Sequence, residues 1–191
     1  MKKILVINGH PVESSYGSAL ADAYYNAAKA ANFNVSLISI GEMAFDPNLK
    51  FGYSKRSELE PDLKNAVDLM KEADHIVWLF PIWWQSTPAL LKGFIDRTFL
   101  PGIAYDMRKG KLPKKLFKGK TSRLIVTSDT PRWYNKIYLK DPAVNQFKKG
   151  TLYFTGIKPV KLTYISPIKN SSDQFRKKWI KNVSLLGMNG N

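Results

Sequence analysis

The sequence predicts an α/β protein in which one parallel β-sheet is covered by helices on both faces. Short apolar runs alternate along the chain with longer segments of helical spacing, the order that builds parallel sheets. The runs Ile4–Ile7 and His75–Phe80 are almost continuously apolar, as expected for strands buried on both faces. The chain has 191 residues, 44% of them hydrophobic. It shows no linker and no internal repeat, so we expect a single domain spanning residues 1–191.

The first half of the chain contains two strands and two helices. Ile4–Ile7 is the first strand, and the Ala- and Tyr-rich segment Ser18–Asn32 is the first helix. Apolar and polar residues alternate in part of Val35–Ile40, which favours an outer strand. The next helix begins near Pro61, and its apolar residues repeat at three and four positions: Leu63, Ala66, Val67, Met70 and Ala73.

The second half continues the alternation. After the strand His75–Phe80, a helix begins at Pro88 and carries Leu90, Leu91, Phe94, Ile95, Thr98 and Phe99 on one side. Leu124–Val126 and Val160–Tyr164 supply the fourth and fifth strands. Ser171–Gln174 has the pattern of a capping box, so a last helix begins there and buries Phe175, Trp179, Val183 and Leu186. The segments Gly41–Glu60 and Pro101–Lys120 are expected to be irregular.

Composition narrows the classes of protein. The chain has no cysteine, which excludes disulfides, thiolate metal sites and a catalytic thiol, and fits a cytoplasmic protein. The apolar run Ile4–Ile7 is too short for a signal peptide or a membrane span. We expect a protein that is not embedded in a membrane and has no metal site.

The chain is strongly basic, with a net charge of +15. The densest run of cations extends from Arg108 to Arg123 and contains no acidic residue. A solvated loop explains it, and attraction of anionic ligands, including phosphorylated cofactors, is a second reading. Dedicated nucleic-acid binding is a third, but no recognition motif accompanies the charge.

Ligands of open parallel sheets bind beyond the carboxyl ends of the strands, where the chain order reverses. The loops to inspect therefore follow Ile7, Phe80 and Val126. The first, Asn8–Ser18, offers a glycine and small hydroxyl residues and leads into a helix, an arrangement that holds a phosphate. It contains neither a dinucleotide fingerprint nor a P-loop. A serine-rich helix cap is the alternative.

The second loop, Phe80–Pro88, places Trp83 and Trp84 after a buried strand. Two tryptophans in a turn between prolines suit the wall of a flat aromatic ligand such as an isoalloxazine ring, and a packing cluster is the alternative. In the third loop, Thr127–Tyr134, Asp129 either lies near the ring or caps the turn. Tyr134 either donates a hydrogen bond to a substrate or packs.

The segment Ala73–Trp84, continued by Pro88–Arg97, Pro101–Tyr105 and Leu152–Gly156, resembles the NAD(P)H:quinone oxidoreductase family, the relatives of DT-diaphorase, which include the modulator-of-drug-activity proteins and ancillary reductases of potassium efflux. The resemblance spans essentially the whole chain. It implies a flavodoxin-like, three-layer fold with a five-stranded parallel sheet in the order 2-1-3-4-5. It also implies a homodimer with the flavin at the subunit interface, and ping-pong, two-electron hydride transfer from NAD(P)H to a quinone-like acceptor.

The resemblance assigns flavin-binding roles to residues of all three loops: His10, Ser15, Tyr16, Gly17, Ser18, Pro81, Ile82, Trp83, Trp84, Gln85, Thr127, Ser128, Asp129 and Thr130. Tyr105 resembles a residue that reaches the acceptor across the dimer, and we expect catalytic roles for Tyr105 and Tyr134. Either FMN or FAD fits, and the lack of an evident adenine-binding element favours FMN. Better-known members carry two glycines where this chain has Asp129 and Thr130. No histidine follows Tyr134, so the Tyr/His relay of the mammalian enzymes is not recoverable.

Three other functions compete with the reductase. The first is an ancillary flavoprotein that associates peripherally with a potassium-efflux antiporter and regulates it. The second is a pure electron carrier, against which the charge of +15 argues because flavodoxins that shuttle electrons are typically acidic. The third is a basic nucleic-acid-binding domain.

Overall fold

The computed structural model describes residues 1–191 and contains a sheet of five parallel strands. The strands are β1 (Lys3–Asn8), β2 (Asn34–Ser39), β3 (His75–Pro81), β6 (Thr121–Thr127) and β7 (Val160–Ile165). They lie in the order β2-β1-β3-β6-β7, and every neighbouring pair is parallel. Numbered within the sheet, this order is 2-1-3-4-5, which confirms the predicted flavodoxin-like topology.

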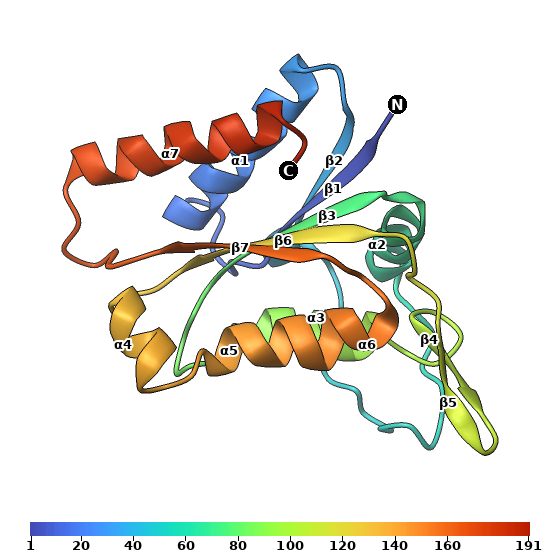
Figure 1. Cartoon of the computed structure of the whole chain (residues 1–191). Helices are drawn as coiled ribbons and strands as arrows, with labels where there is room; N and C mark the ends of the chain where they lie inside the picture. The colour runs from blue at the N-terminus through green and yellow to red at the C-terminus, as the bar shows by residue number, and fades with distance from the viewer.

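Helices cover both faces of the sheet (Figure 1). On one face lie α1 (Tyr16–Ala30) and α7 (Asp173–Met188). The other face is covered by α2 (Pro61–Glu72), α3 (Ala89–Thr98) and a continuous run of α5 (Pro142–Asn145), η2 (Gln146–Leu152, π-helical) and α6 (Tyr153–Thr155). The short α4 (Arg132–Ile137) follows β6 at the carboxyl edge. No helix combines the length and apolarity that crossing a membrane requires.

Strand β3 shows why its sequence is a continuous apolar run. Ile76, Trp78 and Phe80 belong to the core packed under α2, α3 and η2. Val77 and Leu79 belong to the opposite core, under α1 and α7. Because successive side chains of a strand point to opposite faces, a strand covered on both sides is apolar at every position.

Two helices begin at side-chain caps. The Ser15 hydroxyl accepts a hydrogen bond from the Ser18 N–H at 3.1 Å, so α1 starts at Tyr16, two residues before the predicted start. Ser172 caps α7 by accepting from the Phe175 N–H at 3.2 Å. The third helical position is thus Phe175, which cannot return the second bond of a capping box.

The segment Gly41–Glu60 has no strand or helix after η1 (Ile40–Glu42), as predicted. The side chain of Arg97 on α3 is only 4% exposed and binds the carboxyl-terminal end of this segment. Its Nη2 donates to Glu60 Oε2 at 2.7 Å and to the Glu58 carbonyl at 3.0 Å. A buried guanidinium that has a carboxylate and carbonyl partners holds this loop against the helix.

The prediction that Pro101–Lys120 is irregular is wrong for its middle. Tyr105–Arg108 (β4) and Lys111–Lys115 (β5) form an antiparallel hairpin. Gly110 has a φ of 66° in its turn, a backbone conformation that glycine adopts without steric cost. The helices between β6 and β7 were not predicted from the sequence, because long apolar periodicity is lacking there.

Candidate functional site

The loops that follow β1, β3 and β6 meet at one cavity of about 180 Å³. It lies at the carboxyl edge of the sheet, where the strand order reverses between β1 and β3. Ten residues line it: His10, Tyr16, Gly17, Pro81, Ile82, Trp83, Thr127, Ser128, Asp129 and Ile168. Nine of these were predicted from the sequence as flavin contacts. We call this space the edge cavity.

The loop after β1 is held close to the sheet. Gly9 donates its N–H to the Leu79 carbonyl at 2.7 Å, and a Cβ at this position would lie 2.7 Å from a methyl group of Leu91. The Asn8 side chain accepts from the His10 N–H at 3.1 Å and donates to the Ser18 hydroxyl at 3.0 Å. Asn8 therefore ties the end of the strand to the first turn of α1.

The amino end of α1 faces the edge cavity through Tyr16 and Gly17. The Ser18 N–H is satisfied by Ser15, and the Ala19 N–H by the Ser15 carbonyl. The backbone N–H groups of Tyr16 and Gly17 have no acceptor within the helix, since the first turn offers none. Two free donors and the positive end of the helix dipole suit an anionic group.

His10 contributes a neutral imidazole to the wall. Burial lowers the pKa of His10, partly offset by its hydrogen bond with the Val12 backbone. Nδ1 lies 3.0 Å from the Val12 nitrogen and 3.2 Å from the Val12 carbonyl oxygen, so it accepts from the first or donates to the second according to the tautomer. The ring packs edge-on against Trp83, with centroids 5.7 Å apart and planes at 77°.

The loop after β3 forms a tight turn that separates the two tryptophans. Trp83 and Ser86 exchange backbone hydrogen bonds at 3.0 and 2.9 Å. The central residues Trp84 and Gln85 have φ values of 48° and 58°. Trp83 thus turns toward His10 and is 44% exposed, whereas Trp84 is fully exposed. Two adjacent left-handed residues that are not glycine are strained, a feature that concentrates at functional sites.

The loop after β6 is fixed by polar contacts. Asp129 accepts from the Ile168 and Lys169 N–H groups at 3.3 and 2.6 Å, so its carboxylate caps the loop after β7 as it lines the edge cavity. The Ser128 hydroxyl accepts from the Thr130 N–H at 3.1 Å. Ile168, a cavity residue that the sequence analysis missed, is positioned by this cap. Ile168 follows β7, whose loop was not among the three inspected for ligands, and no local sequence pattern marks this residue.

Five predicted contacts do not line the edge cavity: Ser15, Ser18, Trp84, Gln85 and Thr130. The two serines cap and brace the first turn of α1. Gln85 Nε2 lies 3.5 Å from the Thr130 hydroxyl, so these two residues link the second and third loops. Their roles in ligand binding stay predictions from the sequence.

The donor set of the edge cavity fits the phosphate and ring of a flavin. Two buried oxygens of the second loop, Gln85 Oε1 and Thr87 Oγ1, have no hydrogen-bond partner in the protein, which is unusual for a native structure; neither residue lines the edge cavity. No lysine or arginine lines the cavity, so helix N–H groups and hydroxyls would bind the phosphate. At about 180 Å³ the cavity is smaller than typical ligand pockets of roughly 300–1,000 Å³. It would cover one side of a flavin.

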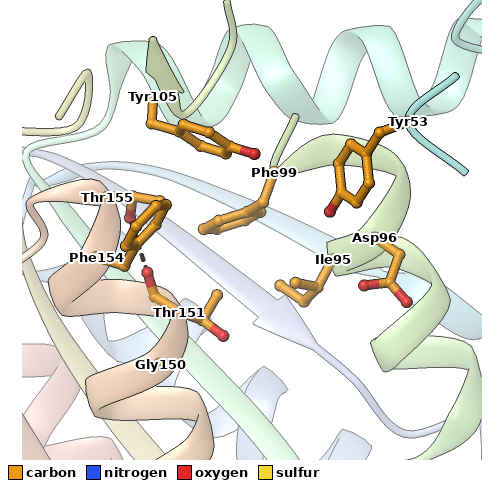
Figure 2. A pocket seen from close by; sticks show the side chains of 9 residues that line it. All are labelled: Tyr53, Ile95, Asp96, Phe99, Tyr105, Gly150, Thr151, Phe154 and Thr155. Carbon is orange, nitrogen blue, oxygen red and sulfur yellow. Dashed lines mark hydrogen bonds between the residues drawn. The ribbon is translucent and has the colours of Figure 1, made fainter. Parts of the chain in front are cut away.

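The other two predicted residues lie elsewhere. Tyr105 lines a separate cavity of about 190 Å³, together with Tyr53, Ile95, Asp96, Phe99, Gly150, Thr151, Phe154 and Thr155 (Figure 2). Its ring packs edge-on against Phe154 at 5.0 Å, and burial raises the pKa of its hydroxyl. We call this space the tyrosine cavity; it shares no residue with the edge cavity.

Tyr134 lies on α4 and lines neither cavity. Its ring stacks on Tyr138 at 5.2 Å and contacts Trp133, and all three residues are exposed. Within one chain, the structure therefore brings neither Tyr105 nor Tyr134 to the edge cavity.

A doubly wound parallel sheet with its cavity at the β1/β3 switch point defines a flavodoxin-like α/β protein. The sequence model of the family described as "Flavodoxin-like fold" matches residues 2–183, and the chain belongs to this family.

Three similar proteins narrow the comparison. The crystal structure of Smu.1420 from Streptococcus mutans UA159 is 32% identical, with 98% of this chain and 99% of that chain covered and a TM-score of 0.83. An uncharacterised NAD(P)H oxidoreductase of Haemophilus influenzae is 28% identical, with 93% of this chain and 90% of the relative covered. The ribosyldihydronicotinamide dehydrogenase [quinone] of Mus musculus is 26% identical, with 92% and 86% covered. The resemblance to the NAD(P)H:quinone oxidoreductase family is thereby confirmed.

Proposed function

We propose that the protein is a flavin-dependent NAD(P)H:quinone oxidoreductase that transfers two electrons in a ping-pong sequence. One observation carries the proposal: loops from three separate strands converge on the edge cavity, with aromatic, hydroxyl and free N–H groups on its walls. The name of the relative from Haemophilus influenzae supports NAD(P)H as the donor. The name of the mouse relative gives ribosyldihydronicotinamide as the donor and supports a quinone acceptor.

The residues of the edge cavity have separable tasks. The N–H groups of Tyr16 and Gly17 would bind the flavin phosphate, and the caps at Ser15 and Ser18 hold these groups in place. Ile82 and Trp83 would lie along the ring, opposite the third loop. The Ile82 N–H already donates to the Thr127 carbonyl at 2.8 Å, which keeps the second and third loops in register. A bound flavin would supply the two-electron redox chemistry.

The second substrate-binding wall would come from another copy of the chain. The edge cavity is too small to enclose a flavin, and the tyrosine cavity lies apart from it in the same chain. In a homodimer of two-fold symmetry, each copy can place its Tyr105 over the edge cavity of the other. NAD(P)H and the acceptor would then occupy the same covered space in turn. A catalytic role of Tyr134 would be exerted from the rim of the edge cavity.

We take the cofactor to be FMN, because the chain has no evident element for the adenosine of FAD. To test this, the purified protein is denatured and the released flavin is identified by chromatography. We expect FMN, and oxidation of NADH or NADPH that depends on an added quinone. The cytoplasmic location stays a prediction from the sequence.

Protein that is colourless as purified, and that shows no flavin absorbance after incubation with FMN or FAD, would contradict the proposal. Flavin binding without quinone-dependent turnover, joined to co-purification with a membrane transporter, would favour the ancillary role. Rapid steady-state oxidation of NAD(P)H with a quinone would exclude a pure electron carrier.

A further inference from the structure

A network of polar side chains joins α4 to β7. Arg132 and Asp141 form a two-fold ion pair, with Arg132 Nη2 2.9 Å from Asp141 Oδ2 and Nη1 on the other oxygen. Asn135 is fully buried, and its Nδ2 donates to Asp141 Oδ1 at 3.2 Å and to the Tyr164 hydroxyl at 3.0 Å. The ion pair therefore orients the Asn135 amide toward Tyr164.

The backbone after α4 is bent so that Asp141 reaches this network. Lys140 and Asp141 have φ values of 58° and 52°, so two successive residues with a Cβ are left-handed. Such a conformation persists only where surrounding contacts hold it. The Asp141 N–H donates to the Asn135 carbonyl at 3.0 Å, and the Asp141 carboxylate is paired with Arg132. The network is thus maintained against local backbone strain.

Tyr164 connects the network to the third loop. Its hydroxyl accepts from Asn135 and donates to the Thr130 carbonyl at 3.5 Å. Burial raises the pKa of Tyr164, and hydrogen bonds with Ser128 and Asn135 lower it in part, so the hydroxyl keeps its proton. Ser128 lines the edge cavity, and its own hydroxyl accepts from the Thr130 N–H at 3.1 Å. One phenolic hydroxyl thus contacts two adjacent parts of the third loop.

Packing alone does not explain the hydroxyl of Tyr164. Tyr24, which belongs to the core on the other face of the sheet, shows what packing alone requires. Its side chain is fully buried, and its hydroxyl has no hydrogen-bond partner. The two tyrosines therefore form a matched pair, in which only Tyr164 uses its hydroxyl.

We propose that Tyr164 is a positioning residue of the edge cavity. Its hydroxyl, oriented by Asn135, fixes the Thr130 peptide and the Ser128 side chain, so that the third loop keeps one arrangement toward a ligand. Tyr164 lines neither the edge cavity nor the tyrosine cavity, so it acts through the loop. The consequence for flavin binding rests on the function proposed above, whereas the consequence for the loop does not.

Hydrogen exchange of the flavin-free protein, followed by mass spectrometry, tests the effect on the loop. Tyr164→Phe removes the hydroxyl and keeps the ring, over which the Arg132 guanidinium lies at 4.7 Å. The amides of Thr127–Tyr134 should exchange about twofold to tenfold faster, the effect of losing one buried hydrogen bond. Those of Asn8–Ser18 should keep their rates. Tyr24→Phe, the matched control, should change neither segment. Unchanged exchange of Thr127–Tyr134 in Tyr164→Phe, or equal acceleration by Tyr24→Phe, would overturn the proposal.

Titration of the flavin-free variants with FMN and with riboflavin tests the effect on the ligand. Riboflavin has the ring and lacks the phosphate. Tyr164→Phe should weaken both by the same factor, about twofold to tenfold, because the third loop would face the ring. Ser15→Ala, which removes the cap of α1, should weaken FMN more than riboflavin. Equal affinities of Tyr164→Phe and the natural protein would overturn the proposal. Failure of the natural protein to bind either flavin would instead contradict the proposed function, and hydrogen exchange would still decide the role of Tyr164.

A double-mutant cycle tests whether Asn135 acts through Tyr164. Asn135→Ala should weaken FMN binding, and Asn135→Ala/Tyr164→Phe should weaken it no more than the stronger single variant. Losses that multiply would show two independent structural contributions and overturn the proposal. Circular dichroism checks that each variant is folded. If Asn135→Ala unfolds, Asp141→Asn replaces it in the cycle, since it removes the charge that orients the amide and asparagine tolerates the left-handed backbone.

Discussion

At the scale of single residues, the two histidines occupy contrasting surroundings. His10 lies at the edge cavity beside Trp83. His75 is only 3% exposed at the start of β3, with its Nδ1 2.7 Å from the Thr121 hydroxyl and its Nε2 buried without a partner. Burial, together with the charges of Lys2, Arg123 and Lys161, lowers the pKa of His75 to about 3. His75 is thus a structural residue that folds in its neutral form.

This low pKa predicts a stability that falls on acidification. The unfolded chain binds a proton at His75 below about pH 6.5, whereas the folded chain does not until about pH 3. In that window the unfolded state holds more protons. The free energy of unfolding should therefore decrease by up to about 1.4 kcal/mol for each pH unit. Urea titrations between pH 7 and pH 5 measure this change in the free energy of unfolding.

His75→Asn provides the comparison, since its amide can bond Thr121 but cannot titrate. Its free energy of unfolding should be lower at pH 7 and should change less with pH than that of the natural protein. His10→Asn, at the more exposed histidine, should keep most of the natural slope. Parallel profiles for the natural protein and His75→Asn would disprove this account.

The two tryptophans of the second loop also occupy contrasting surroundings. Trp83 lines the edge cavity, and Trp84 is fully exposed. Trp83→Ala should weaken flavin binding by roughly threefold to tenfold, as loss of one aromatic contact costs about 0.5–1.5 kcal/mol. Trp84→Ala should change it by less than about twofold. Titration of the flavin-free protein with FMN measures both, and an equal loss in the two variants would give Trp84 the role predicted from the sequence.

At the scale of elements, the crossing of α1 and α7 depends on close approach. Gly187 lies against the Tyr24 backbone, and a Cβ at Gly187 would overlap the Tyr24 carbonyl oxygen. Residues of both helices, including Leu20 and Val183, share one core cluster. Because Tyr16 also donates its hydroxyl to the Arg176 carbonyl at 3.0 Å, the position of α7 helps to hold the amino end of α1 at the edge cavity.

Gly187→Ala should therefore lower the free energy of unfolding by about 1–3 kcal/mol, the usual cost of overpacking. Gly150→Ala is the control, because no atom lies within 4 Å of a Cβ built there. Removing a helical glycine at that position should be neutral or stabilise the protein by up to about 1 kcal/mol. Thermal unfolding of the three proteins distinguishes these outcomes, and equal melting temperatures would show that the helices can move apart freely.

At the scale of the whole molecule, the edge cavity and the tyrosine cavity lie apart in one chain. If they meet only across a dimer, two defective chains should complement each other. Trp83→Ala and Tyr105→Ala proteins are mixed, dissociated and allowed to reassociate. Half of the random dimers then hold one intact site, so the mixture should recover roughly a quarter of the natural activity. Activity no higher than that of the separate variants would contradict a site shared across the dimer.

The sequence alone was sufficient for the sheet and for the position of its ligand edge. Continuous apolar runs such as His75–Phe80 reflect burial on both faces, and the serines around Ser172 mark the start of the last helix. Both signals are local, since they depend on neighbouring residues and on the 2.0 and 3.6 periods of strand and helix. They located the three loops around the edge cavity, whereas the resemblance to the quinone oxidoreductase family supplied nine of its ten residues.

The tertiary structure decided what depends on distant residues or on the path of a turn. Trp83 and Trp84 are identical in sequence terms, yet the left-handed backbone at Trp84 and Gln85 turns one ring toward His10 and the other to solvent. Ile168 reaches the edge cavity because Asp129, nearly forty residues earlier, caps its loop. The hairpin of β4 and β5 was missed because its exposed, cationic strands lack the apolar alternation that burial imposes. Patterns report burial, whereas side-chain direction and long-range contacts require the folded chain.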